Sequence, residues 1–163
     1  MIFLNRRHLG VFFAFIILLG NPVLAGDLML GPLQFRATVE GLPSSGAYLS
    51  IKNNGEVADR LLDVTSDLAH KTELHEMKIS NGVMKMRQVI DGIKIPAGET
   101  VDLKPGGYHV MLMSLKAPLY ANNIFEITLI FESAGNITVK GMAKRPADLA
   151  IVDSSILHKH RID

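Results

Sequence analysis

Apolar and polar positions alternate in short runs through most of the chain, and clusters of turn-forming residues separate the runs. Alternation with a period of two is typical of strands that bury one face, and helical periodicity is hard to find here. We expect about eight strands, over residues 47–52, 60–66, 71–79, 83–89, 100–103, 108–115, 124–132 and 137–142, preceded by an edge strand with a bulge or a short lead-in over 28–38.

Short strands at regular intervals, with Gly, Pro and Asn turns between them, predict an antiparallel β-sandwich or barrel. Ser80-Asn81-Gly82 is a turn signal that joins 71–79 and 83–89 into a hairpin. No linker, repeat or low-complexity segment divides the chain. We therefore expect one all-β domain over residues 26–146 and a flexible C-terminal tail over 147–163.

The first 25 residues have the pattern of a secretory signal peptide. Arg6 and Arg7 precede the apolar run 9–19, Pro22 follows it, and small residues lead up to Ala25. The run is too short to span a bilayer as a resident helix, which needs about twenty residues. We expect cleavage after Ala25 and export to the periplasm or beyond.

Charge and cysteine content exclude several classes of function. Residues 1–25 contain two of the 17 Lys and Arg residues and none of the 16 Asp and Glu residues, so 15 basic and 16 acidic residues remain. A near-neutral chain without a basic block gives no indication of nucleic-acid or anionic-membrane binding. Because there is no cysteine, a lipid anchor, disulfides, a thiolate metal site and a CxxC redox motif are all excluded.

Imidazole and thioether side chains recur at a spacing of two residues between positions 75 and 113. This spacing places side chains on one face of a strand. Thioether sulfur is a soft, neutral donor that favours Cu(I) over Zn(II), Mg(II) or Ca(II), and two neutral imidazoles add borderline donors. The donors are His75, Met77, Met84, Met86, His109, Met111 and Met113.

Each of these residues also has a simpler interpretation. A single Met on a strand usually fills a gap in the core, and a single His usually lies at the surface. Four donors suffice for a Cu(I) site, so Met77 and Met113 are accessory candidates and Met84 is assigned to the core. We place His70 in a loop. His158 and His160 are candidates for an accessory copper site, where Cu(II) is also a candidate, although a solvated tail is the simpler expectation.

The residues around these donors resemble the periplasmic copper chaperones termed PCuAC, whose pattern is His-x10-Met-x21-His-x-Met. Here ten residues separate His75 from Met86, and twenty-two separate Met86 from His109-Val110-Met111. We place the extra residue in the turn at 90–93. Further similarity covers most of residues 45–140, including Leu103-Lys104-Pro105-Gly106-Gly107-Tyr108-His109 and Phe131-Glu132-Ser133-Ala134-Gly135.

The resemblance implies a cupredoxin-like, immunoglobulin-like Greek-key antiparallel sandwich with a Cu(I) site built by His75, Met86, His109 and Met111. It also implies delivery of copper to the CuA centre of cytochrome c oxidase subunit II, alongside Sco-type copper proteins. Turns at 80–82 and 105–107 lie beside the donors in the sequence. We therefore expect the site at the end of the sandwich, where an acceptor can reach it.

Other classes fit the sequence less well. No Ser-His-Asp order, paired carboxylate motif or phosphate loop indicates an enzyme, and a blue-copper electron carrier requires a Cys. A copper monooxygenase with an N-terminal His is disfavoured because we expect the mature chain to begin with Gly26-Asp27. Two alternatives remain: a metal-free periplasmic β-sandwich whose Met-rich face contacts a protein partner, and a copper storage or tolerance protein.

Overall fold

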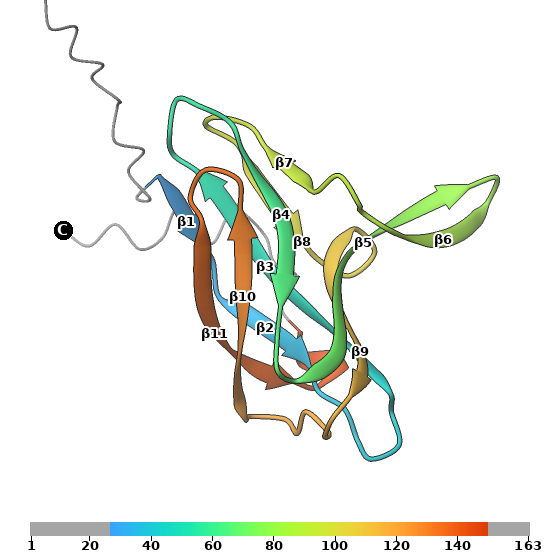
Figure 1. Ribbon diagram of the computed structural model, residues 1–163. Coiled ribbons are helices and arrows are strands. Elements are labelled where there is room, and N and C mark those ends of the chain that lie inside the picture. Colours follow the sequence, from blue (N-terminus) through green and yellow to red (C-terminus); the bar gives the residue numbers. More distant parts are fainter. Residues whose placement is uncertain (1–26, 150–163) are drawn as a thin grey trace, which may run out of the picture.

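The computed structural model describes residues 27–149, and within this range the chain forms eleven strands and no α-helix (Figure 1). A single short 3-10 helix, η1, follows the last strand at Pro146–Asp148. The strands are β1 (Leu28–Leu30), β2 (Leu33–Arg36), β3 (Ser44–Asn53), β4 (Asp59–Thr65), β5 (Ala69–Ser80), β6 (Val83–Gln88), β7 (Ile93–Ile95), β8 (Thr100–Leu103), β9 (Tyr108–Leu115), β10 (Ile124–Phe131) and β11 (Asn136–Lys144).

The predicted number of about eight strands is too low for two reasons. Gly31-Pro32 divides the segment 28–38 into β1 and β2, because Pro32 has no backbone N–H to continue a ladder. Residues 93–95, which the sequence indicated as part of a connection, form β7 and pair antiparallel with β4.

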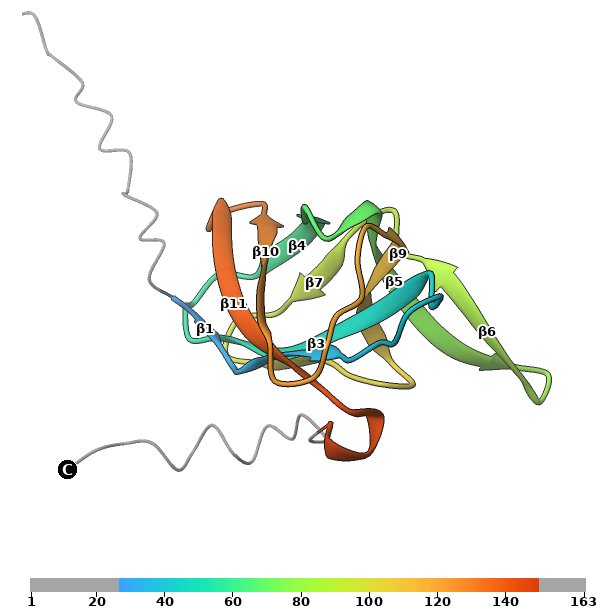
Figure 2. The ribbon, with the colours of Figure 1, turned by 90° about the horizontal axis from the view of Figure 1, so that it is seen from below.

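The strands are hydrogen-bonded in the order β6-β5-β9-β8-β3-β2-β11-β10-β4-β7, with β1 added beside β3. Most pairs are antiparallel, and the exceptions are β11 with β2 and β8 with β9. The path curls, so that β4, β10 and β11 lie across the core from β3 (Figures 1 and 2). The predicted all-β sandwich is confirmed.

One apolar core fills the space between the two halves of this path. It includes Phe35, Leu49, Leu74, Val110 and Leu129, each at most 2% exposed. Complete burial of such a side chain contributes about 1.5–3 kcal/mol. A slip of one residue would turn these side chains out to solvent, so the core fixes the register of every strand that supplies it.

The hairpin of β5 and β6 extends from the body as a two-stranded arm (Figures 1 and 2). Its turn residues Asn81 and Gly82 have φ angles of 53° and 75°, as a two-residue hairpin turn requires. The predicted hairpin is confirmed. All six residues of β6 are exposed, so the arm owes its shape to pairing with β5 and not to burial.

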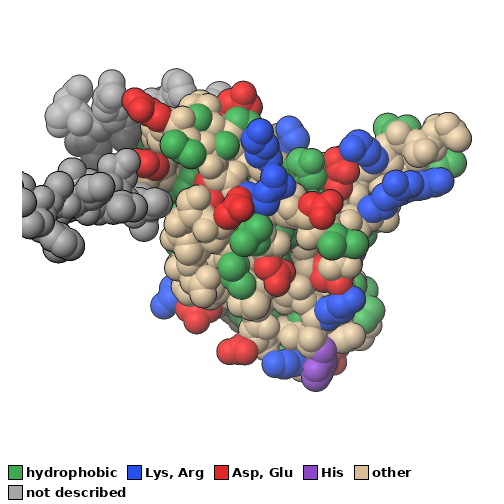
Figure 3. Space-filling model, turned by 45° about the horizontal axis from the view of Figure 1, so that its top comes forward, with side chains coloured by type: hydrophobic (Ala, Val, Ile, Leu, Met, Phe, Trp, Pro, Cys, Tyr) green, Lys and Arg blue, Asp and Glu red, His purple; other side chains and the backbone are tan. Residues whose placement is uncertain are grey.

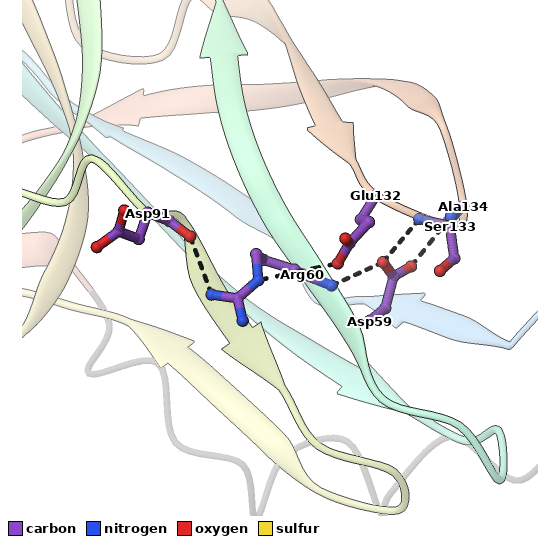
Figure 4. A network of polar contacts seen from close by, with 6 residues as sticks. All are labelled: Asp59, Arg60, Asp91, Glu132, Ser133 and Ala134. Carbon is purple, nitrogen blue, oxygen red and sulfur yellow. Dashed lines mark hydrogen bonds and ion pairs between the residues drawn. The ribbon is translucent and has the colours of Figure 1, made fainter.

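Asp59 fastens β4 to the turn between β10 and β11 (Figure 4). Its carboxylate is buried and accepts hydrogen bonds from the backbone N–H groups of Ser133 at 2.9 Å and Ala134 at 3.0 Å. The neighbouring Arg60 donates to the carbonyl of Asp91 at 2.9 Å, in the turn between β6 and β7. The two residues therefore tie three segments that are distant in sequence.

Some sequence-based predictions fall outside the described residues. These are the signal peptide with its cleavage after Ala25, most of the tail, and the accessory candidates His158 and His160. Over residues 27–149, no helix is long and apolar enough to cross a membrane.

Candidate metal centre

Strand β5 lies between β6 and β9, and its register aligns the predicted donors in cross-strand pairs. His75 lies opposite His109, and Met77 lies opposite Met86. Cross-strand partners share a face, and residues two apart in a strand also share it. The donors therefore lie on one face of the sheet, opposite to the core residues Leu74 and Val110. Donor side chains from β5, β6 and β9 thus share this face.

A cavity of about 300 Å³ opens on this outer face. Four soft donors line it, of which Met86, His109 and Met111 were predicted as ligands and Met77 as an accessory. The other lining residues are Arg36, Ser44, Ser45, Gly46, Tyr48, Pro105 and Gly106.

The position of the cavity partly matches the expected one. The turn of 105–107 borders it, whereas the turn of 80–82 lies at the far end of the arm. The site thus occupies the outer face of the sheet near one end of the strand path.

The side chains that line the cavity are poor ligands for hard cations. No Asp or Glu side chain lines the cavity, and carboxylate oxygens are what Ca²⁺ and Mg²⁺ need. Within residues 27–149, no group of three or more His, Asp or Glu side chains is arranged to hold a metal ion. Metal binding here would depend on the thioethers, which favour a soft ion such as Cu(I).

His109 is held with one nitrogen available. It is 4% exposed, and its Nδ1 lies 3.0 Å from the carbonyl oxygen of Gly107, to which it donates as Nδ1–H. Nε2 then carries the lone pair. Burial lowers the pKa of His109, the hydrogen bond to Gly107 opposes this, and the nearby His75 lowers it further. The neutral form, which binds metals, is favoured.

His75 is oriented by Glu73. Its Nε2 lies 2.8 Å from Oε2 of Glu73, and Lys71 Nζ lies 2.5 Å from the other carboxylate oxygen. These hydrogen bonds, first that of His75 and then that of Lys71, lower the pKa of Glu73, so the ionised carboxylate accepts Nε2–H. Nδ1 of His75 is then the lone-pair nitrogen, and it is buried without a hydrogen-bond partner. A buried acceptor with no donor fits a nitrogen that binds a metal ion.

His75 does not line the cavity itself, although its ring lies beside that of His109. The ring centroids are 5.9 Å apart and the rings are tilted by 57°. Two metal–nitrogen bonds of about 2 Å, plus about 1 Å from each nitrogen to its ring centre, span about 6 Å. The separation of the rings is therefore compatible with one ion bound by both histidines.

Tyr48 and Gly46 form a wall of the cavity that the sequence did not indicate. Gly46 lies opposite Met111 in the pairing of β3 with β9. A Cβ atom on Gly46 would lie 2.5 Å from the hydroxyl oxygen of Tyr48, so the tyrosine ring covers this glycine. Burial raises the pKa of Tyr48, and the positive charge of Arg36 opposes the shift. In the sequence, this wall is indicated only by a Gly two residues before a Tyr within a predicted strand. That pattern is too common in strands to predict a cavity wall.

The remaining donors lie elsewhere. Met113 pairs with Lys71 and Ser44 and does not line the cavity. Met84 was assigned to the core, and this is wrong: it is 57% exposed because β6 projects beyond the body. His70 was placed in a loop, and this is wrong: it is exposed but lies in β5.

Comparison with known proteins gives the family. The profile of the putative lipoprotein LpqE-like family matches residues 28–142, which include every strand except the end of β11. The chain belongs to the LpqE-like family. It is 38% identical over 99 residues to the putative lipoprotein Lxx21020 of Leifsonia xyli subsp. xyli. This match covers 61% of the chain and 60% of that relative.

Solved structures share the fold of this LpqE-like protein. The copper-bound PCuAC domain from PmoF2 is similar with a TM-score of 0.62 and 26% identity, covering 74% of this chain and 95% of that one. The Cu(I) form of DR1885 from Deinococcus radiodurans is similar with a TM-score of 0.56 and 26% identity, over 72% and 78% of the two chains. The resemblance to PCuAC domains seen in the sequence is confirmed.

Proposed function

We propose that this protein is a Cu(I)-binding copper chaperone in which His75, Met86, His109 and Met111 hold one ion. The observation that carries the proposal is the cavity, where thioethers and an imidazole from three strands face one space without any carboxylate. The similarity to a PCuAC domain solved with copper supports the choice of metal.

The ligand set suits a monovalent ion. All four side chains are neutral when they bind, so one positive charge remains at the site and is spread over soft and borderline donors. Glu73 and the carbonyl of Gly107 orient the two imidazoles through their other nitrogens. These partners raise the basicity of the nitrogens that would bind copper.

Release of copper would begin at Met86. This side chain is 46% exposed, whereas His109 is 4% exposed, so an incoming ligand reaches the Met86 side of the ion first. A neutral thioether can leave without taking up a proton, and no charge is stranded in the cavity. The proposed role is carriage and transfer of a metal, with no catalytic step.

The resemblance to PCuAC proteins supports a more specific proposal for the acceptor. We propose the CuA centre of cytochrome c oxidase subunit II, reached together with Sco-type copper proteins in the periplasm. Oxidase activity in a deletion strain tests this. We expect a loss under copper limitation that added copper restores, whereas a storage or tolerance protein would leave oxidase assembly intact at both copper levels.

Titration with Cu(I) against a competing chelator tests the site itself. We expect one tightly bound ion per protein. Two ligands are lost in the Met86→Leu/Met111→Leu variant, which keeps the side chains apolar and of similar volume. Because loss of even one orienting partner typically costs about 10–100-fold in affinity, we expect a weakening of at least that size.

A matched control separates the site from a general effect of methionine content. Met29→Leu/Met142→Leu removes two exposed methionines from β1 and β11, outside the cavity. It should bind Cu(I) like the wild type. No retention of copper by the wild-type protein, or equal losses in the two double variants, would contradict the proposal.

Exposed apolar side chains on the arm support one alternative function, a metal-free module that binds a protein partner. Ile79, Val83 and Met84 are 73%, 58% and 57% exposed, and such a surface can contact a protein partner without any metal. A metal-free interaction module predicts no Cu(I) retention in the same titration, so one experiment decides between the two functions.

A further inference from the structure

The two faces of the arm formed by β5 and β6 differ in character. Cross-strand pairing places Met77 opposite Met86 and Ile79 opposite Met84, and these four side chains share one face. The other face carries Glu76, Lys78, Lys85 and Arg87 beside Ser80 and Val83. In Figure 3, Lys and Arg side chains follow one side of the arm and hydrophobic side chains gather near its end. The charges of the arm are thus segregated from its thioethers.

Three of the chain's eight methionines lie on that one face. Met84 and Met86 are 57% and 46% exposed, so their side chains do not fill the core. Directly opposed residues have Cβ atoms about 4.5–5.5 Å apart, and diagonal neighbours such as Met77 and Met84 lie about 7–8 Å apart, within reach of long side chains. Methionine has three flexible torsions, so the three sulfurs can converge on one point.

We infer that Met77, Met84 and Met86 form a second metal site on the arm, built of thioethers alone, for a monovalent soft cation such as Cu(I). Among the residues paired in the hairpin, 75–80 and 83–88, no carboxylate shares this face, and the cross-strand neighbour Ile79 is apolar. Neutral sulfur donors without oxygen ligands discriminate against Ca²⁺, Mg²⁺ and Zn²⁺.

The arm site adjoins the cavity. Met77 and Met86 line the cavity, while Met84 lies two residues further along the arm and does not. Met86 can therefore serve either site, and an ion exchanging between them would stay bound to at least one sulfur. A role for the arm site as a place where copper is held before it enters or after it leaves the cavity rests on the proposed function.

Titration with Ag(I), a redox-stable probe of soft sites, tests the inference by NMR of ¹³C-methyl methionine in the full protein. We expect two phases. The Met111 methyl group should shift with the first ion. The Met86 methyl group should also shift with the first ion and shift again with the second, whereas the Met84 methyl group should shift only with the second, together with Met77, and saturate at two ions in total. Met29 and Met142, exposed at 48% and 39% on other strands, serve as internal controls and should not move.

Variants make the result decisive. Met84→Leu should lose the second phase and keep the first, and Met29→Leu should keep both. A Met84 methyl group that never shifts, shifts only in step with Met29, or shifts within a single phase of one ion would overturn the arm site. Retention of the second phase in Met84→Leu would overturn it as well. Failure of the proposed function is distinguishable, because it would remove the first phase, reported by Met111.

Discussion

His75 gives the clearest argument at the scale of a single residue, because its two ring nitrogens have different surroundings. Nε2 is tied to the buried carboxylate of Glu73, and Nδ1 is buried with no partner. A histidine in a metal-free structural role would be expected to have both nitrogens hydrogen-bonded or exposed. The unpaired nitrogen is the one that a metal ion would use.

Truncation of Glu73 tests this orientation. In Glu73→Ala, Nε2–H loses its acceptor and the ring is free to change tautomer, so we expect Cu(I) affinity to fall by about 10–100-fold. Glu76→Ala is the control, since Glu76 points to the other face and pairs with Lys78 at 3.2 Å. Both are measured by chelator competition. Equal affinities for the two variants would contradict the role assigned to Glu73.

Gly46 tests the wall of the cavity. The Cβ atom of Gly46→Ala would lie 2.5 Å from the Tyr48 hydroxyl oxygen, so the ring must move. We expect a loss of stability of about 1–3 kcal/mol in urea unfolding, together with weaker Cu(I) binding as the ring shifts against the site. The control is Gly107→Ala, whose Cβ would be 3.6 Å from its nearest neighbour, Lys104. A stable Gly46→Ala protein with unchanged copper affinity would show that the ring moves freely.

At the scale of elements, the arm and the body depend on different interactions. The body strands bury alternate residues in the core, whereas β6 buries none and is held by its turn and by β5. The site lies where the two meet. Its β9 donors are held by the packing of Val110 and Leu112, and Met86 is held by a hairpin that can open locally. A rigid half and a movable half suit the proposed uptake and release of an ion.

The contact between β4 and the turn that joins β10 to β11 can be tested at Asp59. Asp59→Ala leaves the N–H groups of Ser133 and Ala134 without their acceptor, and we expect a loss of about 1–3 kcal/mol or more. Asp63→Ala is the control in the same strand, because the Asp63 carboxylate accepts a local hydrogen bond from the N–H of the adjacent Val64. Urea unfolding measures both. A smaller loss at Asp59 than at Asp63 would show that the network contributes little.

At the scale of the whole molecule, the sequence correctly predicted those features that depend on neighbouring residues in the chain. The period of two predicted the main strands, Asn81-Gly82 predicted the hairpin, and the His-x-Met spacing put the donors on common faces. It failed for β7, which is three residues long and owes its existence to pairing with β4. It failed again for Met84, whose exposure depends on how far the arm extends beyond the body.

The sequence by itself determined the kind of chemistry: a chain with no cysteine repeats thioethers and imidazoles at strand spacing, and these donors are neutral and soft or borderline. Only the tertiary structure decided which donors meet. The pairing of His75 with His109 joins strands separated by the whole of β6, β7 and β8, and it is set by the burial of Leu74 against Val110 and not by any local preference. The same packing brings Met77 into the cavity and keeps Glu73 beside His75 on the outer face. This long-range register depends on the core and not on the donors themselves.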